Sequence, residues 1–190
     1  MPLHFKREEF SKRLDCLKEL MSVKKLDGIL LFRQESMFYL TGYDTFGYVF
    51  FQCLYLGIDG KLILLTRAPD LRQAQQTSIV EDIRIWVDGE TANPALELKE
   101  ILRESGSEGK SVGVEYDSYG LTAKNGKMLD SNSRHQPRCE YLPQWTFSVP
   151  VSNQANESEV SAFHQFLDKG IEKKRSRKCH ILSDKTYSPA

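Results

Sequence analysis

An aromatic cluster around two glycines is the densest group of side chains that could recognise another molecule. Residues 42–51 read Gly-Tyr-Asp-Thr-Phe-Gly-Tyr-Val-Phe-Phe, with five aromatics in ten residues. A buried strand would account for Val49 and Phe50, or for Tyr48 and Phe51, depending on which pair faces inward. Because one face of a sheet cannot bury all five aromatic rings, we expect some of them to form a contact surface.

Histidine and cysteine side chains could bind zinc, but their spacing argues against a site. The candidates all lie in the last third of the chain: His135, Cys139, His164, Cys179 and His180. Structural zinc sites draw on compact ligand pairs held on ordered turns, and this set matches no compact ligand pattern. We therefore expect no metal site in this chain.

The first 130 residues lack the motifs of the common hydrolase active sites. Activated nucleophiles, metal-bound water and paired carboxylates each need a characteristic arrangement. The region has no G-x-S-x-G, no H-E-x-x-H and no phosphate-binding glycine loop, and its one histidine is His4. We expect His4 to be exposed to solvent rather than to act as a general base. The sequence thus predicts no catalytic residue and no cofactor, and we do not expect the chain alone to be an enzyme.

Hydrophobic periodicity and turn residues predict the elements that would carry the aromatic cluster. Asp59-Gly60 between two apolar runs is a strong hairpin signal, Asn93-Pro94 is typical of a helix start, and Ser36 is a candidate cap. The predicted order is an α/β fold, in which a three-layer mixed β-sheet is flanked by helices. The predicted helices span 6–24, 37–40, 68–76, 94–104 and 122–130, and the predicted strands span 29–32, 46–56, 61–66, 83–87 and 111–116.

Composition divides the chain at about residue 130. Residues 1–130 carry 17 Lys and Arg against 20 Asp and Glu, whereas residues 131–190 carry 9 against 6. We therefore predict an α/β domain over 1–130 and a divergent, poorly ordered tail over 131–190. The cationic run at 173–178 could bind nucleic acid, but without interleaved aromatics it reads as a solvated tail.

Charge, cysteine usage and the N-terminus favour a soluble cytoplasmic protein. The formal net charge is zero, which argues against nucleic-acid or membrane partners. Four widely spaced cysteines are too few for a disulfide framework, and Cys16 and Cys53 are expected to be buried thiols. Acidic residues soon after the start argue against a signal peptide.

Residues 35–43, Glu-Ser-Met-Phe-Tyr-Leu-Thr-Gly-Tyr, resemble the N-x-x-Y-L-T-G signature of the creatinase N-terminal domain. That domain precedes the catalytic domain in aminopeptidase P, prolidase, creatinase and ectoine hydrolase-like enzymes of the M24 metallopeptidase family. The similarity extends over about residues 3–130, in matching order and spacing. Its supporting segments are 5–20, 62–70, 81–86 and 112–117.

The resemblance implies a ribonuclease H-like mixed sheet and a role outside the chemistry. In the family this domain packs on the catalytic domain, supports dimers or tetramers, and lends side chains to the neighbouring subunit's active site. The loop after Leu-Thr-Gly supplies such residues, which here points to Tyr43, Asp44, Phe46 and Tyr48 as substrate-pocket candidates in trans. For Phe46 and Tyr48 the alternative is ordinary packing.

The sequence departs from the family pattern after residue 130. The family's metal ligands, two Asp, one His and two Glu, lie in a larger C-terminal domain, which the residues 131–190 do not resemble. We therefore expect a truncated protein that serves as a non-catalytic accessory or oligomerisation domain, through self-association or contact with an M24 catalytic domain. The alternatives are a subunit that completes the active site of a separately encoded M24 hydrolase, and a metal- or nucleic-acid-binding role for the tail.

Overall fold

The structure is a computed structural model that describes residues 3–130 and 138–141, all within the first of two compact units, residues 1–147. Its described helices are α1 (Arg7–Lys24), α2 (Gln34–Thr41), α3 (Leu71–Thr77), α4 (Pro94–Glu104) and α5 (Ala123–Asp130), with a 3-10 turn at Ala68–Asp70. Its strands are β1 (Gly28–Leu31), β2 (Cys53–Gly57), β3 (Leu62–Arg67), β4 (Asp82–Trp86), β5 (Ser111–Val114) and β6 (Arg138–Tyr141).

The six strands form one mixed sheet in the order β4-β3-β2-β1-β5-β6. Strand β2 runs antiparallel to both β1 and β3, whereas β3–β4, β1–β5 and β5–β6 are parallel pairs. The five strands other than β2 therefore all end at the same edge of the sheet, which we call the carboxyl edge. In open α/β sheets this edge is the usual location of binding sites.

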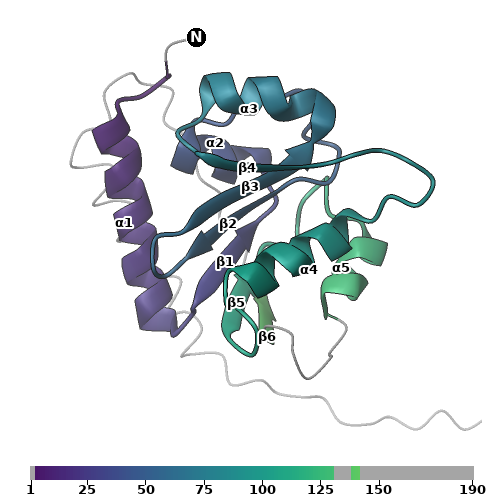
Figure 1. Ribbon diagram of the computed structural model, residues 1–190. Coiled ribbons are helices and arrows are strands. Elements are labelled where there is room, and N and C mark those ends of the chain that lie inside the picture. The colour runs from purple at the N-terminus through teal and green to yellow at the C-terminus, as the bar shows by residue number, and fades with distance from the viewer. Residues whose placement is uncertain (1–2, 131–137, 142–190) are drawn as a thin grey trace, which may run out of the picture. The chain divides into compact units, whose positions relative to one another are not determined.

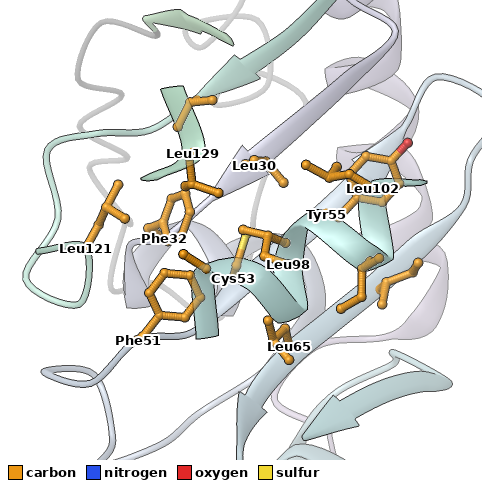
Figure 2. Packing of buried hydrophobic residues seen from close by; sticks show 14 of the residues in the cluster. Leu30, Phe32, Phe51, Cys53, Tyr55, Leu65, Leu98, Leu102, Leu121 and Leu129 are labelled. Atoms are coloured by element: carbon orange, nitrogen blue, oxygen red, sulfur yellow. The ribbon is translucent and has the colours of Figure 1, made fainter. Parts of the chain in front are cut away.

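Helices cover both faces of the sheet, which gives the three layers that the sequence predicts (Figure 1). On one face α1, α2 and α3 pack on side chains of β1, β2 and β3 in one buried cluster. On the other face Leu98 and Leu102 of α4 and Leu129 of α5 pack against Leu30, Tyr55 and their neighbours (Figure 2). The α/β class and the mixed sheet are thus confirmed.

Turn and capping residues in the sequence predicted several of these elements correctly. Gly60 has φ 89° in the turn between β2 and β3, a conformation that glycine adopts without strain. The side chain of Asn93 accepts a hydrogen bond from the amide of Leu96 and so caps α4. His4 is exposed and Cys53 is buried, as predicted, whereas Cys16 is only partly buried.

Three predictions about elements were wrong. Strand β2 begins at Cys53, and residues 46–49 form a turn in place of the predicted strand from residue 46. Ser36 does not cap α2, which begins at Gln34, because Ser36 lies inside the helix and donates to Glu115. Strand β6 pairs with β5 beyond residue 130, so the predicted boundary omits one strand of the sheet, and the nature of the remaining tail stays a prediction.

Candidate functional site

An exposed aromatic surface lies at the carboxyl edge. The turn that precedes β2 exposes Phe46 (90%), Tyr48, Val49 and Phe50, and the connection between β5 and α5 adds Tyr119 (80%). The rings of Tyr48 and Tyr119 meet edge to face, with centroids 6.2 Å apart. We call these five residues the aromatic surface. Large exposed side chains gathered in this way are typical of sites that bind another molecule.

The buried carboxylate of Asp70 holds the backbone of this turn in place. Its Oδ1 accepts a hydrogen bond of 2.7 Å from the hydroxyl of Thr45, which in turn accepts one of 2.9 Å from the amide of Gly47. Its Oδ2 accepts a bond of 3.1 Å from Nε of Arg67, whose guanidinium lies 3.5 Å from the ring centroid of Phe50. A charge-assisted pair that is largely shielded from water is stronger than an exposed one. The turn is therefore fixed from beneath while its aromatic rings face outward.

Two glycines are required for this packing. A Cβ on Gly47 would lie 2.6 Å from Oδ2 of Asp70, and a Cβ on Gly120 would lie 2.3 Å from the carbonyl oxygen of Phe50. Contacts this short do not occur, so a larger residue at 47 would displace the Asp70 carboxylate or the turn, and a larger residue at 120 would displace the backbone of Phe50 or the segment that carries Tyr119. The turn that carries Phe46 and the segment that carries Tyr119 are thus held together by the close contact between Gly120 and the backbone of Phe50.

A second buried network lies under the turn. The Tyr43 side chain is fully buried, and its hydroxyl is 2.9 Å from that of Thr66 and donates a bond of 3.0 Å to Oε1 of Gln52. Gln52, the residue before β2, donates from its Nε2 to Oε1 of Gln34, the first residue of α2. Burial raises the pKa of Tyr43 to about 12, so the hydroxyl stays protonated at neutral pH. Tyr43 therefore supports the site from within.

The carboxylate of Glu115 joins the ends of β5 and β1. Its Oε2 accepts hydrogen bonds from the amides of Phe32 (3.0 Å) and Arg33 (2.9 Å), and its Oε1 accepts one of 2.8 Å from the hydroxyl of Ser36. These donors lie at the start of α2, where the helix dipole favours negative charge. Burial nevertheless raises the pKa of Glu115 above its ordinary value, and its hydrogen bonds oppose that rise. The segment that carries Tyr119 begins at this anchor.

We expect the stability provided by Glu115 to depend on pH. Its folded pKa is raised above the ordinary 4.5, so the folded state binds the proton more tightly than the unfolded chain. The free energy of unfolding should therefore fall as pH rises from about 4.5 through the folded pKa, by at most about 1.4 kcal/mol per pH unit. The Glu115→Gln variant does not titrate at this position, and the other carboxylates cancel in the comparison. Urea unfolding of both proteins across this range gives the free energy of unfolding of the wild type minus that of Glu115→Gln. This difference should fall as pH rises, and a difference that stays constant or grows would contradict a raised pKa for Glu115.

The structure separates the four residues that the sequence proposed for a substrate pocket. Phe46 is 90% exposed, so ordinary packing does not account for it, and Asp44 is exposed beside it. Tyr48 is 48% exposed and its ring packs on that of Tyr119, so packing stays an alternative for Tyr48. Tyr43 faces the protein interior. Their role in a substrate pocket stays a prediction.

Sequence reasoning missed Tyr119, and it missed the clamp of Asp70 and Arg67. An aromatic residue beside a glycine, as in Tyr119-Gly120, was the available signal. Asp70 and Arg67 lie only three positions apart. Thr45, which Asp70 holds, is 25 positions away, so no local sequence pattern indicated their contact.

The described residues contain neither a cluster of candidate metal ligands nor a helix that could span a membrane. Among the side chains that the structure describes, those of residues 3–130, no group of three or more from His, Cys, Asp and Glu is placed to hold a metal ion. The candidate zinc ligands named from the sequence lie outside the described side chains, and only the backbone of Cys139 is described. The cationic run at 173–178 also lies outside the described residues. None of the described helices combines the length and the apolar character needed to cross a membrane.

Comparisons with curated proteins point to one family. The model of the creatinase/prolidase N-terminal domain matches residues 13–138. The ectoine hydrolase of Halomonas elongata is 30% identical over 129 residues, which cover 64% of this chain and 32% of that protein. An uncharacterised hydrolase/peptidase of Sinorhizobium fredii is 28% identical over 130 residues, which cover 65% of this chain and 33% of that protein. The chain thus spans about a third of the length of these relatives.

Solved structures share the fold. The creatinase/prolidase N-terminal domain of an X-Pro dipeptidase from Streptococcus pyogenes superposes with a TM-score of 0.56 at 21% identity, covering 69% of this chain and 93% of that one. A dipeptidase from Pyrococcus horikoshii gives a TM-score of 0.54 at 20% identity, covering 87% of this chain and 44% of that one. Together with the match to the family model, these likenesses show that the chain belongs to the creatinase/prolidase N-terminal domain family.

Proposed function

We propose that this chain provides a non-catalytic accessory and oligomerisation domain that acts through protein contacts, with the aromatic surface docking on the catalytic domain of an M24 hydrolase. The observation that carries the proposal is Phe46, which is 90% exposed on a turn whose backbone is clamped by Asp70. An exposed ring on an already ordered turn loses little conformational entropy on binding. Aromatic side chains are also enriched among the residues that dominate binding energy.

A second candidate function is that the domain completes the substrate pocket of a separately encoded M24 hydrolase. The exposed side chains of Asp44 and Phe46, two residues apart, favour this alternative. A carboxylate and an aromatic ring offer a docked catalytic domain both a charged and an apolar contact with substrate. Under this alternative, docking would raise catalytic activity as well as produce binding.

The partner test uses the ectoine hydrolase of Halomonas elongata from which the region matched by this chain has been deleted. We expect the full chain to bind the remaining protein, measured by titration calorimetry. A rise in ectoine hydrolysis on mixing would favour the second candidate, and binding without a rise would favour the first. If the two proteins do not bind at concentrations of about 100 µM, a level at which even weak specific complexes form, the docking proposal fails.

The non-catalytic role has its own test. We expect the purified chain alone to hydrolyse neither Xaa-Pro dipeptides nor ectoine. Turnover that persists through repurification and is removed by a chelator would contradict this role.

The described thiols of Cys16 and Cys53 are unbridged, which agrees with a reducing compartment, and the cytoplasm is the location we propose.

A further inference from the structure

Strand β4 ends the sheet on the side away from β6, as Figure 1 and the strand order show. Each of its five residues has a partner on β3, from Asp82 opposite Ile63 to Trp86 opposite Arg67. Among the strands that the structure describes, β4 has no neighbour on its other side. A regular strand with one open side can pair with another strand through its backbone.

The side chains of β4 and the residue after it leave this edge apolar on one face and charged on the other. Ile85 is 44% exposed and Val87 is 68% exposed. On the other face Arg84 forms ion pairs with Asp82 of its own strand and with Glu104 of α4. Charged edge residues usually discourage pairing, but here the cation and the anion lie two residues apart and on the same face.

That spacing makes the strand complementary to itself. When two copies pair antiparallel about a two-fold axis at Ile83, Asp82 of each copy lies opposite Arg84 of the other, and the two Ile83 side chains meet. An axis at Asp82 would place the two carboxylates opposite each other, and an axis at Arg84 would do the same with the two guanidinium groups. An axis at Ile85 would place Asp82 opposite Asp88. An axis at Trp86 would place Arg84 opposite Asp88, but only Trp86 would then face another residue of β4. Opposite charges stabilise directly facing pairs and like charges destabilise them, so charge and strand length together select the axis at Ile83.

We propose that two copies of this chain associate by antiparallel pairing of their β4 strands about Ile83, which joins two sheets into one. The partner is a second copy because the charges of the strand complement those of the same strand reversed. A two-fold axis closes such a contact at two copies. The inference rests on the oligomerisation part of the proposed function and uses a surface other than the aromatic surface.

Charge exchange tests the pairing in the full chain by sedimentation equilibrium. Asp82→Arg and Arg84→Asp should each weaken dimerisation by on the order of 10-fold, because each creates two facing like-charge pairs. The double variant Asp82→Arg/Arg84→Asp restores both pairs and should recover the affinity to within about threefold. Circular dichroism checks that all variants are folded. Equal affinities for the single variants and the wild type would overturn the proposal.

Cysteine cross-linking tests the axis without altering the charges. Residue 83 faces its own copy at the Cα separation of an antiparallel pair, which suits a disulfide. Ile83→Cys should therefore give a cross-linked dimer under mild oxidation, whereas Ile85→Cys, which faces Glu81, and the wild type should not.

The possible results separate this inference from the proposed function. A dimer in which Ile83→Cys does not cross-link would contradict the β4 contact and leave the oligomerisation role standing. A wild-type chain that stays monomeric at about 100 µM, a concentration sufficient for even weak association, would contradict both. Phe46→Ala should dimerise like the wild type, because Phe46 belongs to the aromatic surface.

Discussion

Replacing Phe46 with alanine is expected to weaken binding to an M24 catalytic domain by about 30-fold or more, the effect of losing a binding hot spot worth at least about 2 kcal/mol. Phe46 is 90% exposed, so its removal takes little from the fold itself. Titration calorimetry with the deletion variant of the ectoine hydrolase measures the change. The large loss is expected because a ring on a clamped turn contributes buried area without first having to be ordered.

A matched control is available on α4. Leu96 is also an exposed apolar residue (53%), but it lies on a helix and outside the aromatic surface. We expect Leu96→Ala to bind within about twofold of the wild type, in line with the near-neutral contacts outside hot spots. Similar losses for Phe46→Ala and Leu96→Ala, or no loss for Phe46→Ala, would contradict the assignment of the aromatic surface as the docking site.

Replacing Gly42 with alanine should lower the free energy of unfolding by about 2–5 kcal/mol. Gly42 has φ 80°, which costs an L-residue about 1–2 kcal/mol. A Cβ there would also lie 2.7 Å from the carbonyl oxygen of Thr77 and 3.0 Å from the ring of Phe10. Overpacking of this kind adds about 1–3 kcal/mol. Denaturant unfolding of the full chain measures the loss.

Two other glycines separate the cost of the positive φ from the cost of overpacking. Gly106 has φ 68° with nothing within 4 Å of its Cβ position, so Gly106→Ala reports the backbone cost alone, about 1–2 kcal/mol. Gly89 has open space around it and no positive φ, so Gly89→Ala should lie within about 0.5 kcal/mol of the wild type. If Gly42→Ala were no more destabilising than Gly106→Ala, the close packing of the α2 end against α3 would be refuted.

Features that depend on neighbours in the sequence were predictable. The turn at Asp59-Gly60 and the cap at Asn93 each involve residues at most three positions apart, so their signals survive in the sequence alone. The order of predicted helices and strands along the sequence likewise predicted that helices would flank the sheet. The resemblance around Leu-Thr-Gly directed attention to residues 43–48, which include part of the aromatic surface.

Features that depend on distant contacts were not predictable. Aromatic residues from Phe46 onward favour a strand by propensity, but Thr45 and Gly47 pack on Asp70, and this contact imposes a turn. Ser36 looked like a helix cap, yet its partner is Glu115, 79 positions away. Strand β6 alternates polar and apolar residues over only four positions before Leu142-Pro143, a strand signal too short to stand out without its pairing with β5.

Hydrogen–deuterium exchange on the full chain, with and without the M24 catalytic part of the ectoine hydrolase, tests most directly whether the aromatic surface is a protein contact. The account predicts added protection at residues 44–50 and 116–121, where the aromatic surface lies, and unchanged exchange along α4. Protection confined to α4, or a complex that forms while 44–50 and 116–121 exchange as in the free chain, would contradict it.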